Sequence, residues 1–128
     1  MKRLATCLLA LLGLLLLAGP GFAQEAKGDW AGTLEVAPGT RLRLAIHISA
    51  GADGAPQGTM DSIDQGAFGI PLAEIVATAG KLSFTVPAVA GRYEGQWDAA
   101  AKGWNGQWSQ SGVTWPLAFS AAAPAAPP

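Results

Sequence analysis

The sequence predicts an all-β protein: a small lipocalin-like antiparallel barrel of about eight strands, preceded by a signal peptide. Short segments of alternating apolar and polar residues recur between glycine-rich turns, and no amphipathic helix pattern follows the first 23 residues. Regular short strands of this kind are typical of sandwiches and barrels. Several segments also alternate glycine with large aromatic residues, which favours a barrel because a small closed sheet fills its interior in that way.

The first 23 residues have the pattern of a secretory signal peptide. A basic start at residues 1–3 precedes a leucine-rich run at 4–18, and small residues before Gln24 form a cleavage site. A retained anchor is the alternative, but the run is short for a bilayer span. We therefore expect a periplasmic or secreted protein with no membrane association after cleavage.

Composition limits the chemistry that the mature chain can perform. The full sequence of 128 residues is enough for one domain, and Cys7, the only cysteine, lies within the predicted signal peptide. After cleavage there would be no disulfide, thiol nucleophile or thiolate metal site. The formal charge of the whole chain is −1, and its charged residues are scattered. Nucleic-acid binding, which needs clustered Lys and Arg, is not expected.

The predicted domain spans residues 28–120, after a short polar lead at 24–27 and before a disordered, Ala/Pro-rich tail at 121–128. Eight strands are expected, at residues 29–36, 41–49, 57–62, 72–78, 81–86, 92–98, 103–109 and 113–120. A short helix remains the alternative for 72–78. Pro116 lacks a backbone N–H, so we expect it on an edge or where the barrel is incompletely closed.

The aromatic residues allow two interpretations. They fill the interior of the barrel, or some of them line a pocket for an apolar ligand or a sugar ring. The glycines between them favour dense packing. The candidates for a pocket are Trp30, Tyr93, Trp97 and Trp108.

The segment at residues 60–72 differs from the strand pattern around it, because it combines acids, glycines and a proline. We expect an ordered connection in which the carboxylates accept backbone hydrogen bonds in Asx-type turns and the glycines allow positive φ. Acid–base catalysis by a carboxylate pair and calcium binding are alternatives, but calcium needs more oxygen ligands than this segment offers. We therefore expect no metal and no cofactor. The candidate binding residues are Asp61, Asp64, Gln65, Gly66, Gly69 and Pro71.

No catalytic residue is predicted. His47 is the only histidine, and strand alternation places it on the outer face with Arg41 and Arg43. The Gly-x-Ser-x-Gly motif that exposes the nucleophile of an α/β-hydrolase is absent from the sequence. A triad assembled in space from distant residues is the alternative.

Residues 61–71 (DSIDQGAFGIP) resemble a segment of the small N-terminal β-domain found ahead of the catalytic domain in some secreted bacterial α/β-hydrolases of the serine esterase or peptidase type. The matching segments, which together span nearly all of 28–120, also include 28–34 (GDWAGTL), 42–48 (LRLAIHI), 93–95 (YEG) and 108–112 (WSQSG). The resemblance implies a β-domain that works in a hydrolase-associated setting. The 128 residues contain no catalytic domain, so the resemblance does not confer catalysis.

We therefore expect an exported, non-catalytic accessory domain that docks on an α/β-hydrolase or on its substrate through residues 61–71. A periplasmic carrier of a small apolar ligand is the second hypothesis, and a hydrolase in its own right is the third.

Overall fold

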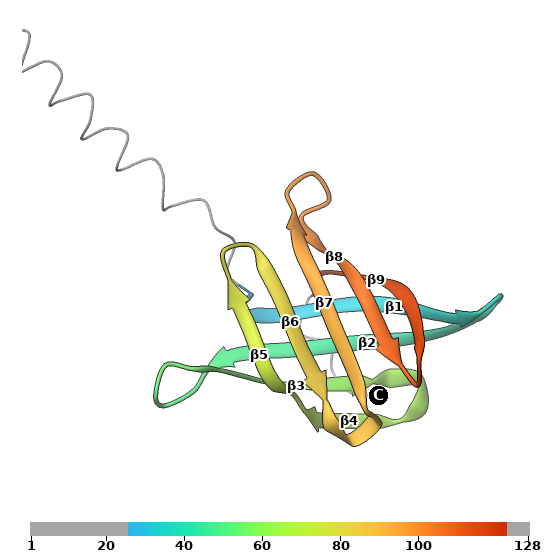
Figure 1. Ribbon diagram of the computed structural model, residues 1–128, viewed down its shortest axis with the longest axis horizontal. Helices are drawn as coiled ribbons and strands as arrows, with labels where there is room; N and C mark the ends of the chain where they lie inside the picture. The colour runs from blue at the N-terminus through green and yellow to red at the C-terminus, as the bar shows by residue number, and fades with distance from the viewer. Residues whose placement is uncertain (1–25, 123–128) are drawn as a thin grey trace, which may run out of the picture.

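A computed structural model describes residues 26–122, which form nine antiparallel strands and two short 3-10 helices, η2 (Ile63–Gln65) and η3 (Pro87–Val89) (Figure 1). The predicted signal peptide and residues 123–128 lie outside the described residues. The strands are β1 (Gly28–Ala37), β2 (Thr40–Ala50), β3 (Pro56–Ser62), β4 (Ala67–Pro71), β5 (Ala73–Thr78), β6 (Lys81–Val86), β7 (Gly91–Asp98), β8 (Gly103–Gln110) and β9 (Val113–Ala121).

The strands form one sheet that curls into a nearly closed barrel. Its order is β4-β3-β2-β1-β9-β8-β7-β6-β5, and β1–β4 cross the steeply running β5–β9 in Figure 1. The two edge strands, β4 and β5, follow each other in the chain. They are joined by Leu72, whose N–H donates to the carbonyl of Gly58 on β3 at 3.0 Å. The predicted all-β barrel is confirmed, with one strand more than expected.

The interior is filled by the apolar residues of each alternating segment. On β1 and β2 these are the even-numbered positions, as the sequence pattern indicated. The polar atoms of two buried aromatics are satisfied: Trp30 Nε1 donates to the carbonyl of Ala26 at 2.7 Å, and the Tyr93 hydroxyl donates to that of Leu117 at 3.1 Å. Burial raises the pKa of the Tyr93 hydroxyl well above its ordinary value.

Glycines permit close approach where β7 pairs with β8. Gly95 lies directly opposite Gly106. A Cβ on Gly106 would lie 2.2 Å from the carbonyl oxygen of Glu94 and 2.7 Å from the hydroxyl of Tyr93. The large/small alternation that favoured a barrel therefore has a direct steric origin.

Several boundaries differ from those expected. Residues 67–71 form a strand, although the sequence suggested only a connection there. Ala26, placed in the polar lead, is buried, and Ala121, placed in the tail, pairs with Trp30 at the end of β9. Residues 73–78 are a strand and not a helix, and Pro116 lies on a part of β9 that pairs with β8 but not with β1. Within residues 26–122, no helix has the length and apolar character of a membrane span.

Candidate functional site

A histidine clamped by two carboxylates joins the first three strands on the outer face of the barrel. Nδ1 of His47 on β2 lies 2.7 Å from Oδ1 of Asp29 on β1, and its Nε2 lies 2.8 Å from Oδ2 of Asp61 on β3. The β1–β2 register brings Asp29 directly opposite His47. Asp61 also accepts the N–H of Gly69 at 2.8 Å, so the cluster reaches into the loop that follows β3.

This geometry requires the charged imidazolium. A carboxylate only accepts hydrogen bonds, and a neutral imidazole has one N–H, so both contacts form only when both ring nitrogens carry protons. The hydrogen bonds to Asp61 and Asp29 raise the pKa of His47 above its ordinary value of 6.5, although partial burial opposes the shift. With both nitrogens engaged, His47 has no free lone pair with which to act as a base.

A second ion pair fixes the η2 turn against β2. Asp64 accepts hydrogen bonds from Nε and Nη2 of Arg43, the shortest being 2.8 Å, and also from the Arg43 backbone N–H at 2.7 Å. These hydrogen bonds lower the pKa of the Asp64 carboxyl. Both predicted acids therefore accept backbone hydrogen bonds. The donors are distant residues, however, and not those of a local Asx turn.

The remaining candidate residues of 61–71 determine the backbone conformation of this segment. Gly66 ends η2 with φ of +66° and Gly69 has φ of +70°, so the expected positive φ occurs at both glycines. Gln65 accepts a hydrogen bond from the buried Ser62 hydroxyl at 2.6 Å. Pro71 ends β4 opposite Thr59. Residues 61–71 are thus held on β2 and β3 by side-chain and backbone contacts.

The edge strand β4 presents an aromatic side chain to solvent. Phe68 is 46% exposed, which makes it one of the most exposed large apolar residues of the described chain. β4 lies against η3, where Val89 is also exposed, and Gln110 at the end of β8 donates to the Val89 carbonyl at 2.9 Å. We call the surface formed by Phe68 and Val89 the loop-end patch.

The predicted pocket aromatics lie in the core or against it. Trp30, Tyr93 and Trp108 are buried, and Trp97 is partly buried. Trp97 makes edge-on ring contacts with Trp30 at 6.0 Å and with Trp104 at 5.2 Å between ring centroids. Tyr93 packs similarly against Phe119. The three buried rings are therefore part of the packed interior, whereas Trp97 lies at its margin.

No family model matches the chain, and no curated protein or solved structure matches it either. The similarity to the N-terminal domain of α/β-hydrolases therefore stays a prediction that rests on the quoted residues.

Sequence reasoning placed His47 on the outer face but missed its partners Asp29 and Asp61 as a set. It also did not predict that Asp64 pairs with Arg43. The sequence signal for the Asp29–His47 contact is the spacing of these two residues about the turn at Pro38 and Gly39.

Proposed function

We propose that this chain is an exported, non-catalytic accessory domain that docks on an α/β-hydrolase through its loop-end patch. The single observation that supports this most directly is Phe68, an aromatic side chain exposed to solvent on the edge strand β4, in a segment held in place by charged contacts. Ordering a segment before binding reduces the entropy cost of association, and an exposed aromatic on such a segment is a typical anchor.

The packing of the barrel favours docking over a carrier function. A carrier would need space inside the sheet, and the interior is occupied by buried side chains such as Tyr93, Phe84 and Trp104. The site chemistry likewise favours binding over hydrolysis, because His47 is held between Asp29 and Asp61 and makes no hydrogen bond to a hydroxyl in the described part of the chain.

The test begins with a hydrolase among the exported proteins of the cell that produces this chain. The immobilised chain should retain an activity that hydrolyses p-nitrophenyl esters, and the purified enzyme should bind the free chain in calorimetry. Phe68→Ser should weaken this complex by about tenfold or more, because a central aromatic anchor contributes heavily to affinity. Its melting temperature should stay close to that of the wild type, since Phe68 is exposed.

Val76→Ser is the matched control. Val76 is 48% exposed, similar to Phe68, but it lies on β5 away from the loop-end patch. It should bind the hydrolase like the wild type. Failure to retain any esterase, or equal binding by Phe68→Ser and the wild type, would show that the proposed docking is wrong. Asp64→Asn tests the positioning of residues 61–71 separately from the contact that Phe68 makes. It should loosen this segment and weaken binding, with little change in melting temperature.

A further inference from the structure

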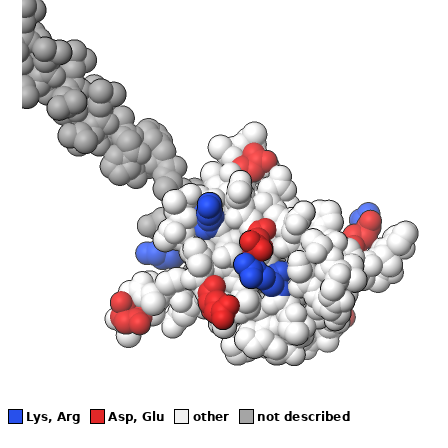
Figure 2. Space-filling view, viewed as in Figure 1, with Lys and Arg blue, Asp and Glu red and all other residues white. Residues whose placement is uncertain are grey.

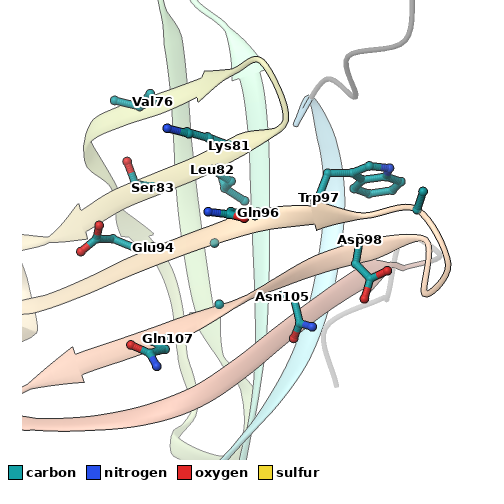
Figure 3. A pocket seen from close by; sticks show the side chains of 13 residues that line it. Val76, Lys81, Leu82, Ser83, Glu94, Gln96, Trp97, Asp98, Asn105 and Gln107 are labelled. Carbon is teal, nitrogen blue, oxygen red and sulfur yellow. The ribbon is translucent and has the colours of Figure 1, made fainter.

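A hollow of about 780 Å³ lies on the outer face of β6, β7 and β8, away from the loop-end patch (Figure 3). Strand register arranges its outward side chains in two rows across the sheet. One row contains Lys81, Gln96 and Asn105, and the other contains Ser83, Glu94 and Gln107. Figure 3 shows these polar side chains around the same space.

The floor of the hollow between the rows is bare backbone. Gly95 and Gly106 face each other there, and both line the hollow. A Cβ on either glycine would point into the core, 2.5 Å from the Tyr93 hydroxyl for Gly95 and 2.7 Å for Gly106, so this position presents only backbone to the hollow. Strand alternation therefore leaves a backbone floor between two rows of outward-facing polar side chains.

Three neighbouring carboxamides have unused hydrogen-bonding groups. Gln96, Asn105 and Gln107 make no side-chain hydrogen bond with any other residue in the range 26–122. Each carboxamide has two donor hydrogens and an acceptor oxygen on one rigid plane. This combination matches pairs of hydroxyl groups, which themselves both donate and accept.

The charges of the hollow favour an uncharged ligand. Glu94 pairs with Arg92 at 3.2 Å, and Asp98 accepts the N–H groups of Ala100 and Ala101 in the following turn. Lys81 is the one cationic side chain in the lining. The lining thus combines neutral amides with charges of both signs, without the cluster of one sign that an ionic ligand would require.

The backbone around the hollow argues against a peptide. β6, β7 and β8 are each paired on both sides, so no free strand edge is available here for an added strand. Trp97 forms part of the lining, and its ring makes edge-on contacts with Trp30 and Trp104. Recognition would rely on hydrogen bonds, which predicts weak binding.

We propose that this hollow binds a neutral oligosaccharide through the carboxamides of Gln96, Asn105 and Gln107. The proposal is independent of the docking function, because it involves different strands and a different surface.

The experiment is a titration of the ¹⁵N-labelled chain with maltohexaose, cellohexaose, xylohexaose and chitohexaose, followed by NMR. At least one sugar should produce saturable shifts in the side-chain amides of Gln96, Asn105 and Gln107 and in the backbone amides of Gly95 and Gly106. The double variant N105A/Q107A should lower the affinity for that sugar by about tenfold, as expected for two lost hydrogen bonds.

Gln57→Ala is the control, since Gln57 is an exposed carboxamide on β3 that does not line the hollow. It should bind the sugar like the wild type, as should Phe68→Ser. Absence of saturable shifts with all four sugars, or shifts confined to other surfaces, would overturn the proposal. Unchanged affinity in N105A/Q107A, or saturation of the hollow by a neutral hexapeptide and by no sugar, would do the same.

Discussion

Replacing His47 should lower the stability of the barrel in a way that depends on pH. A hydrogen bond to a charged group contributes about 1.5–3 kcal/mol when it is well formed. The His47 side chain is 41% exposed, so solvent screening reduces the two contacts to about 1–2 kcal/mol together. In His47→Gln the amide can donate to only one of Asp29 and Asp61, because its oxygen cannot donate to the other.

The direction of the pH dependence follows from the raised pKa of His47. The stabilisation is fully present below the ordinary pKa of 6.5, where the unfolded chain is also protonated, and it is lost as pH rises through the pKa of the folded state. The stability deficit of His47→Gln should therefore be about 1 kcal/mol near pH 5.5 and approach zero at alkaline pH.

Urea denaturation of the wild type and His47→Gln at a series of pH values between about 5.5 and 9.5 measures this difference, since ΔG falls linearly with denaturant. Gln57→Ala, a substitution on β3 that adds or removes no titrating group, should give a curve parallel to that of the wild type. A deficit that is constant over the pH range, or that grows as pH rises, would refute the imidazolium clamp.

Two further predictions concern the core. Gly106→Ala should lower the free energy of unfolding by about 2–3 kcal/mol in urea, because its Cβ would overlap backbone atoms of β7, whereas Asn105→Ala beside it should change little. Trp30→Phe should cost about 1 kcal/mol more than Trp104→Phe, because Trp30 Nε1 donates a hydrogen bond whereas the buried Trp104 Nε1 has no partner among the described residues. Equal losses for the two tryptophans would contradict this account.

The strands were predictable because each buries one face. Alternation alone placed Leu44, Ile46 and Ile48 inward on β2, and Leu82, Phe84 and Val86 inward on β6, and all six are buried. β4 escaped prediction because residues 67–71 have no such alternation: none is buried, and Gly69 and Pro71 are poor strand formers. Its pairing comes from the chain reversal at η2 and not from its own propensity.

The contacts of residues 61–71 were hidden from the sequence for a similar reason. Asp64 reaches Arg43 only because η2 turns the chain back over β2, and Asp61 reaches Gly69 across an irregularity in the β3–β4 register. An acid followed by glycines indicates a turn, but the donors that it meets depend on which strands lie beside it. Local turn chemistry therefore predicted the acceptors and not the donors.

The Asp29–His47 contact, by contrast, follows from the sequence if register is treated explicitly. A two-residue turn at Pro38 and Gly39, continued without irregularity, would place Asp29 opposite the buried Ile48. Residues directly opposite each other in an antiparallel pair share a face, and the inward residues of both strands have even numbers, so that register cannot bury both apolar sets. The hairpin must shift by one residue, and the structure places this bulge between Glu35 and Ala37. The same shift that aligns the two apolar faces in the core also brings Asp29 opposite His47 on the outside. The contact of His47 with the two carboxylates is thus a consequence of the register that buries both apolar faces. It depends on the bulge as much as on the side chains of Asp29, His47 and Asp61.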